Sequence, residues 1–171
     1  MTKLALLSAR VLFGNTDLLH KGEAVDWRRG HMPAVGVISN AGWKPVVIGF
    51  SPRAPEEERG DAMFRKALES ACAALLDLGL VRKAVPLFTC CHTERSKCSC
   101  RKPGGPLWLD ARRLPHGCVP VTNTRFVCDS AETSFGLDAG APTVVISDSP
   151  VDAPTGVQRY ASLLDFARSL R

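Results

Sequence analysis

The sequence predicts an α/β fold in which helices flank a mainly parallel β-sheet. Short apolar runs alternate along the chain with longer segments whose apolar residues recur at helical spacing. This alternation is typical of helices that cover a parallel sheet. The chain has 171 residues, of which 45% are hydrophobic, so it can bury about two-thirds of its unfolded surface in one core. We therefore expect a single domain over residues 1–171.

Five apolar runs are the predicted strands, at residues 4–7, 46–48, 84–88, 124–128 and 143–146. The first lies in an apolar N-terminal segment that Arg10 interrupts and that no small-residue cleavage site follows. We interpret it as a buried strand and not as a signal peptide. All the apolar runs are far shorter than the roughly 20 residues of a membrane span, so no membrane association is expected.

Helices are predicted between these strands. Residues 61–78 form the clearest amphipathic pattern, with Gly79 as its stop signal. The apolar positions of that pattern are Met63, Ala67, Ala71, Ala74 and Leu78. Further helices are expected at 106–114, from Asp129 to about Gly140, and at 160–170. Two long loops, at 14–33 and 89–105, exceed what a simple connection needs.

Cysteines cluster in the second of these loops. The chain has seven cysteines, and four of them lie with His92 within residues 90–100. Such clustering suits a metal better than disulfides. A C-x-H pair and a C-x-C pair can surround one zinc ion tetrahedrally through Cys90, His92, Cys98 and Cys100, and a site closed in this way is structural. Cys91 can replace a neighbouring ligand, and free thiols or a disulfide are the alternatives.

The remaining cysteines, Cys72, Cys118 and Cys128, lie in apolar surroundings and are predicted to be small core residues. Because no export signal is evident, we expect the chain in the cytoplasm or another reducing compartment inside the cell, where thiols stay free to bind metal.

The formal net charge is +5, from 22 basic and 17 acidic residues, with local excesses at 95–102 and at Arg112–Arg113. Such a charge attracts polyanions of any kind, so it does not distinguish RNA, DNA or phosphorylated metabolites. A solvated basic surface is the simplest interpretation.

The loop residues carry a family resemblance. Residues 98–103, Cys-Ser-Cys-Arg-Lys-Pro, follow the C-x-H pair and resemble the zinc-loop signature of heptose bisphosphate phosphatases and histidinol-phosphate phosphatases, which belong to the haloacid dehalogenase (HAD) superfamily. Residues 102–107 resemble its K-P-x-P-G-M stretch, 126–130 its V-G-D, and 139–145 its A-G-x-x-T-x-x-V. The resemblance implies a Rossmann-like, HAD-type sheet with a zinc loop at about 89–105, and supports Cys90 over Cys91 as a ligand.

The resemblance also implies a D-x-D-G-T motif after the first strand, whose first Asp attacks phosphorus and binds Mg²⁺ and whose second Asp is the general acid and base. Ser8 and Arg10 stand at these positions. An alternative register gives Gly14-Asn15-Thr16, again without carboxylates. A serine hydroxyl needs a base and is a weak metal ligand, and a guanidinium stays protonated. We expect no catalytic residues here and no Mg²⁺ cofactor.

Three further residues match the family's phosphate and metal positions. Ser51 and Lys102 are candidate phosphate ligands, and Asp129 is the candidate Mg²⁺ carboxylate. The family's second acid is Thr133 in this chain, with Glu132 beside it. Lys102 could equally be a surface lysine, and Asp129 could be a helix N-cap.

These observations favour a catalytically inactive, phosphatase-like protein that binds a protein or a macromolecular complex, with nucleic acid as a further candidate partner. One alternative is a residual phosphatase for a sugar phosphate or histidinol phosphate, which recruits Asp17, Asp129 or Asp148. Another is a zinc-stabilised nucleic-acid-binding module. Its contacts would come from Arg95, Lys97, Arg101, Lys102, Arg112 and Arg113, with Trp108 for base stacking.

Overall fold

The computed structural model describes residues 1–13, 26–50, 58–90, 98–101, 105–114, 117–147 and 154–171. Its main feature is a six-stranded sheet in the order β3-β2-β1-β6-β7-β8, in which all neighbouring strands are parallel. A small antiparallel pair, β4-β5, lies outside it. The strands are β1 (Lys3–Ser8), β2 (Trp43–Phe50), β3 (Leu87–Cys90), β4 (Arg113–Leu114), β5 (Gly117–Cys118), β6 (Thr124–Cys128), β7 (Thr143–Ile146) and β8 (Gln158–Tyr160).

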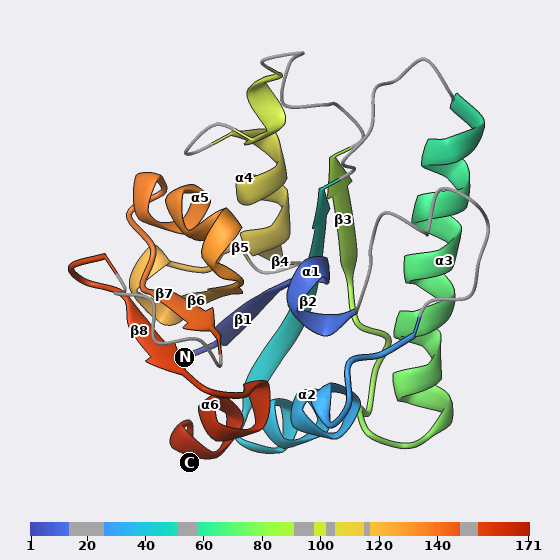
Figure 1. Cartoon of the computed structure of the whole chain (residues 1–171), viewed down its shortest axis with the longest axis horizontal. Helices are drawn as coiled ribbons and strands as arrows, with labels where there is room; N and C mark the ends of the chain where they lie inside the picture. Colours follow the sequence, from blue (N-terminus) through green and yellow to red (C-terminus); the bar gives the residue numbers. More distant parts are fainter. Residues whose placement is uncertain (14–25, 51–57, 91–97, 102–104, 115–116, 148–153) are drawn as a thin grey trace.

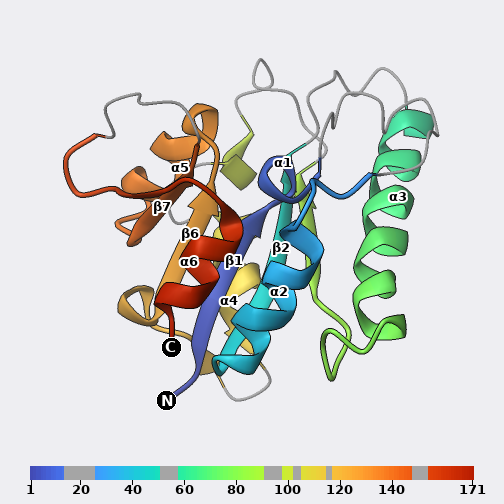
Figure 2. The same cartoon turned by 60° about the horizontal axis from the view of Figure 1, so that its bottom comes forward.

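Helices cover both faces of the sheet (Figures 1 and 2). One hydrophobic core joins the sheet to α2 (His31–Asn40), α3 (Glu58–Asp77) and α6 (Leu163–Ser169). The other core joins it to α4 (Pro106–Arg112) and α5 (Thr133–Asp138). Short turns complete the chain: α1 (Ala9–Leu12), η3 (Ser99–Arg101), η4 (Val121–Asn123) and η5 (Ser130–Glu132).

The central strand β1 shows why the sheet needs helices on both sides. Ala5 and Leu7 enter the core beneath α2, while Leu4 and Leu6 enter the opposite core beneath α4, and all four are fully buried. A strand that is apolar on both faces is typical of parallel sheets. The predicted α/β class, with a mainly parallel sheet flanked by helices, is confirmed.

Several predicted boundaries are wrong. The strand expected at 84–88 begins only at Leu87, because Pro86 has no N–H to donate to the sheet. Helix α2 lies partly inside the predicted loop 14–33, with Pro33 tolerated in its first turn. The tail expected as one helix first pairs Tyr160 with Ile146 in β8, and α6 then begins after Ser162, whose Oγ accepts a hydrogen bond from the Asp165 N–H at 3.1 Å.

The strand order also locates the position for a ligand site. Counted along the chain, the strands of the main sheet run 3-2-1-4-5-6, so the connections reverse direction between β1 and β6. In open α/β sheets, ligands bind outside the carboxyl ends of the strands at such a switch point. No helix in the described ranges is long and apolar enough to cross a membrane.

Candidate functional site

A network of polar side chains occupies this switch point. Ser8 is the last residue of β1, and Glu132 ends the 3₁₀ turn that follows β6. The Ser8 hydroxyl is fully buried, donates a hydrogen bond to Glu132 Oε2, and accepts one from the Arg10 N–H at 3.2 Å. Ser8 is therefore both the N-cap of α1 and a link between the two central strands.

An ion pair lies beside this link. Arg10 Nε donates to Asp129 Oδ2 at 2.8 Å, and the two side chains are 45% and 19% exposed. The other oxygen of Asp129 accepts from the Ala131 N–H at 3.1 Å, so Asp129 also caps η5. Of the two roles that the sequence left open for Asp129, the N-cap is observed, and the role as a Mg²⁺ carboxylate stays a prediction.

The arrangement defines what the end of β1 offers chemically. Residues 1–16 contain no Asp or Glu, so β1 and α1 present a hydroxyl and a guanidinium. The Ser8 proton points to the Glu132 carboxylate, and the charge of Asp129 is neutralised by Arg10. Thr133, which the sequence resemblance aligns with a second acid, is buried and donates its hydroxyl to the Ser130 carbonyl at 3.0 Å.

Cys128, the last residue of β6, lies under this network. Burial raises the pKa of its thiol to about 12, and the nearby charges of Glu132 and Asp129 add to the rise. Its Sγ donates to the Val144 carbonyl. Cys128 and Cys72 are buried, as predicted, but the prediction of a core position is wrong for Cys118, which is exposed on β5.

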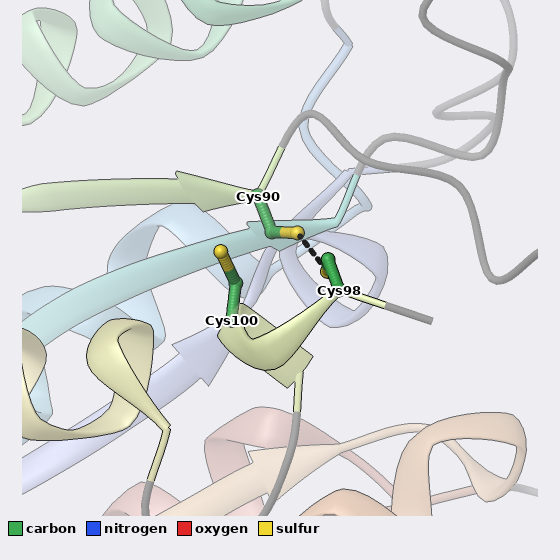
Figure 3. A group of neighbouring side chains, drawn as sticks. All are labelled: Cys90, Cys98 and Cys100. Carbon is green, nitrogen blue, oxygen red and sulfur yellow. Dashed lines mark hydrogen bonds between the residues drawn. The ribbon is translucent and has the colours of Figure 1, made fainter. Parts of the chain in front are cut away.

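A cluster of thiols lies at the same edge of the sheet, at the end of β3. Cys90 is the last residue of that strand and is 1% exposed. Cys98 directly precedes η3, and Cys100 is the second residue of η3. The three Sγ atoms lie within 4.8 Å of one another, with Cys90 and Cys98 at 3.5 Å (Figure 3).

This geometry fits a metal. Tetrahedral zinc with Zn–S bonds of about 2.3 Å places its sulfur ligands about 3.8 Å apart, close to the spacing of this cluster. The cluster could therefore bind a metal such as zinc. His92, the predicted fourth ligand, lies outside the described residues, as do Cys91, Ser51 and Lys102 and the alternative acids Asp17 and Asp148.

Two residues of the predicted nucleic-acid contact set are placed differently from expectation. Trp108 is 1% exposed and packs against Phe126 and Phe135, with ring centroids 6.2 and 5.7 Å apart, so it cannot stack on bases. Arg112 is buried over the Trp108 ring and donates through Nε and Nη2 to the Val119 carbonyl at 2.8 and 2.6 Å. The apolar spacing of α4 could have indicated that both face the core.

Comparison with solved structures places this fold. D,D-heptose 1,7-bisphosphate phosphatase from B. bronchiseptica, solved with magnesium and phosphate, shares 21% identity over 99% of this chain and 98% of its own, with a TM-score of 0.77. The enzyme of the same name from Burkholderia thailandensis shares 16% identity over 98% and 97%, with a TM-score of 0.65.

A candidate HAD-like phosphatase from Mesorhizobium loti shares 17% identity over 99% of this chain and 85% of its own, with a TM-score of 0.73. No protein-family model matches the sequence, and no curated protein matches it significantly. The likeness spans the whole chain, and it establishes a HAD-like α/β fold.

Proposed function

We propose that this HAD-like protein is a catalytically inactive relative of phosphatases that serves as a binding or structural subunit of a protein or macromolecular assembly. The observation that carries the proposal is the ion pair between Arg10 and Asp129. At the switch point of a phosphatase-like sheet, a guanidinium neutralises the carboxylate that the family resemblance assigns to Mg²⁺.

The nucleophile position supports the same conclusion. Phosphoryl transfer needs a placed nucleophile, management of its proton and neutralisation of charge. Ser8 is fully buried, and the group that accepts its proton is a carboxylate, which is a weak base for a hydroxyl. Arg10 stays protonated and cannot act as general acid and base.

The surroundings of Asp129, the candidate Mg²⁺ carboxylate, also support the proposal of an inactive protein. A cation that approaches Asp129 meets the positive charge of Arg10, and like charges at close range repel each other. Asp129 is also engaged by the Ala131 N–H. The chain therefore satisfies its own polar groups where a phosphatase would bind metal and substrate.

We assign a structural role to the cysteine cluster. Cys90, Cys98 and Cys100 would hold zinc, with His92 as fourth ligand; the ion would be closed to water and would tie the end of β3 to η3. All three cysteines also contribute to the core beneath α4. A zinc loop retained beside a neutralised site indicates that the shape of this edge is used for binding.

The experiment is a phosphate-release assay with Mg²⁺ on sugar phosphates, histidinol phosphate and an aryl phosphate. We expect no turnover by the wild type above background. The double change Ser8→Asp with Arg10→Asp restores the carboxylates, and activity confined to it would support the proposal. The change Arg65→Gln, which removes an ion-paired arginine on α3, is the matched control. Mg²⁺-dependent turnover by the wild type that Asp129→Ala abolishes would reveal a residual phosphatase and refute the proposal.

A further inference from the structure

Basic side chains gather at the amino-terminal edge of the main sheet, opposite the site described above. Figure 2 shows this edge at the end of β1 that carries the N-terminus. Because the strands are parallel, their first residues and the segments that lead into them meet there. The basic edge, as we name it, consists of Lys3, Lys44, Arg82, Lys83, Arg113 and Arg125.

The members of the basic edge follow the order of the strands. Arg82 and Lys83 precede β3, Lys44 lies in β2, Lys3 opens β1, and Arg125 lies in β6. Strand alternation places Lys3 and Arg125 with Trp43 on the face of the sheet that α2 covers, and Lys44 on the face that α4 covers. The cations therefore surround the first residues of the central strands on both faces of the sheet. Arg113 adds a further charge from the segment after α4.

Trp43 holds two of these cations close together. Lys3 Nζ lies 5.4 Å from the centroid of the Trp43 ring, and Arg125 Cζ lies 5.5 Å from the same centroid. Stacking on an aromatic ring stabilises a cation and restricts its side chain. Two like charges are thereby held on one ring, where they repel each other unless an anion lies between or beside them.

In the described part of the chain, acidic side chains pair with only one member of the basic edge. Arg113 is 3.9 Å from Asp110, and no other described carboxylate forms an ion pair with a member of the basic edge. Asp77 and Asp138, which end α3 and α5 at the same side, form no ion pair with it. Lys3, Arg82, Lys83 and Arg113 are exposed, and Lys44 and Arg125 are partly exposed.

We propose that the basic edge binds the phosphate backbone of a nucleic acid. A group of exposed cations that needs no pocket suits the repeated charges of a phosphate backbone. Protein interfaces are enriched in aromatic anchors that become buried on binding, whereas the tryptophan at this edge is only 7% exposed and offers little aromatic surface to a protein partner. The inference does not depend on whether the switch-point site hydrolyses phosphate.

The test measures binding of a labelled single-stranded oligonucleotide to the whole protein by fluorescence anisotropy over a range of salt concentrations. For a single strand, the slope of log K against log salt becomes less steep by about 0.7 for each phosphate contact that the protein loses. We therefore expect Lys3→Gln with Arg125→Gln to weaken binding and to reduce the slope by about 1.4. Arg65→Gln with Lys66→Gln on α3 removes the same formal charge and should leave the slope unchanged.

A second pair of substitutions separates charge from folding. Lys44→Gln with Arg82→Gln touches neither Trp43 nor its two cations, and it should produce the same loss of slope with an unchanged melting temperature. The proposal is overturned if the protein shows no saturable binding at low salt, or if edge and control variants bind alike. Tighter binding of polyglutamate than of the oligonucleotide would assign the surface to an acidic protein instead and equally overturn it.

Discussion

The sequence resemblance aligns Ser8 with a catalytic nucleophile, but in the structure its hydroxyl forms two hydrogen bonds that join parts of the fold. It accepts from the Arg10 N–H and donates to Glu132, which joins α1 to the turn after β6. The N-cap and the buried hydrogen bond each contribute about 1 kcal/mol in typical proteins.

We expect Ser8→Ala to lower the free energy of unfolding by about 1–3 kcal/mol, because α1 loses its cap and Glu132 loses this donor. Urea denaturation measures the change. Ser130→Ala, at an exposed serine of the same edge, is the control and should alter stability by less than about 0.5 kcal/mol. Equal stability of the two variants would show that Ser8 has no structural role.

His31 provides a second prediction at this scale. Burial lowers the pKa of His31 from its ordinary value of 6.5, the hydrogen bond to Val11 opposes this shift, and the positive charge of Arg28 adds to it. Neutral His31 donates from Nδ1 to the Val11 carbonyl at 2.7 Å, which ties α2 to α1. Protonation is therefore harder in the folded protein than in the unfolded chain.

Because the unfolded chain binds the proton more readily, the stability from His31 is complete above about pH 6.5 and falls as the pH drops below it, by at most about 1.4 kcal/mol per pH unit. We expect the stability difference between wild type and His31→Gln to shrink from pH 8 to pH 5. We compare the two proteins because acid also protonates the metal ligands, and this effect is common to both and cancels in the difference. Parallel pH curves for the two proteins would contradict the prediction.

Helix α5 approaches the sheet closely at Gly136. A Cβ atom added at Gly136 would clash with Thr143 Oγ1 and would lie only 2.6 Å from Phe126 Cδ1. Both neighbours belong to strands, β7 and β6, and both are buried. Glycine at this position lets α5 pack directly against β6 and β7, although glycine weakens helices in general.

Gly136→Ala is therefore expected to destabilise the protein by about 1–3 kcal/mol through overpacking, against the usual gain from alanine in a helix. Thermal and urea unfolding measure it. The control is Ser134→Ala at an exposed position of the same helix, which should be neutral or slightly stabilising. An increase in stability for Gly136→Ala would show that α5 moves away without cost.

The comparison of sequence with structure is also clearest for single elements. Thr124–Cys128 and Thr143–Ile146 were predictable as strands because each is a short apolar run between turns. Helix α2 was missed because its residues continue a loop-like stretch. The pair Arg10–Asp129 could not be derived either, since its members are 119 residues apart and meet only because β1 and β6 are neighbours. Local pattern predicts elements, whereas the site depends on strand order.

For the whole molecule, the cysteine cluster is the feature with the widest effect. Cys90, Cys98 and Cys100 belong to the core that joins the sheet to α4. A metal bound there stabilises the folded state alone, so its binding energy adds to the stability of the entire chain.

We expect purified protein to contain one zinc per chain, and Cys98→Ala or chelation to lower the melting temperature by at least about 5 °C, since 1 kcal/mol corresponds to about 2–4 °C at this size. Metal analysis and calorimetry measure the two effects. Cys118→Ala, at an exposed thiol outside the cluster, should change neither. Less than about half an equivalent of zinc, in the absence of chelator, would refute the structural zinc site.

The hydrogen bond between Ser8 and Glu132 and the ion pair between Arg10 and Asp129 also constrain how this chain can change by mutation. Ser8→Asp alone would set a new carboxylate against Glu132, and Arg10→Asp alone would leave Asp129 without its cation and add another negative charge beside it. Each single step brings like charges together, and residues in one network do not change independently. Any route from this arrangement to one with paired carboxylates on β1 therefore loses stability at its first step, which disfavours substitutions at positions 8 and 10.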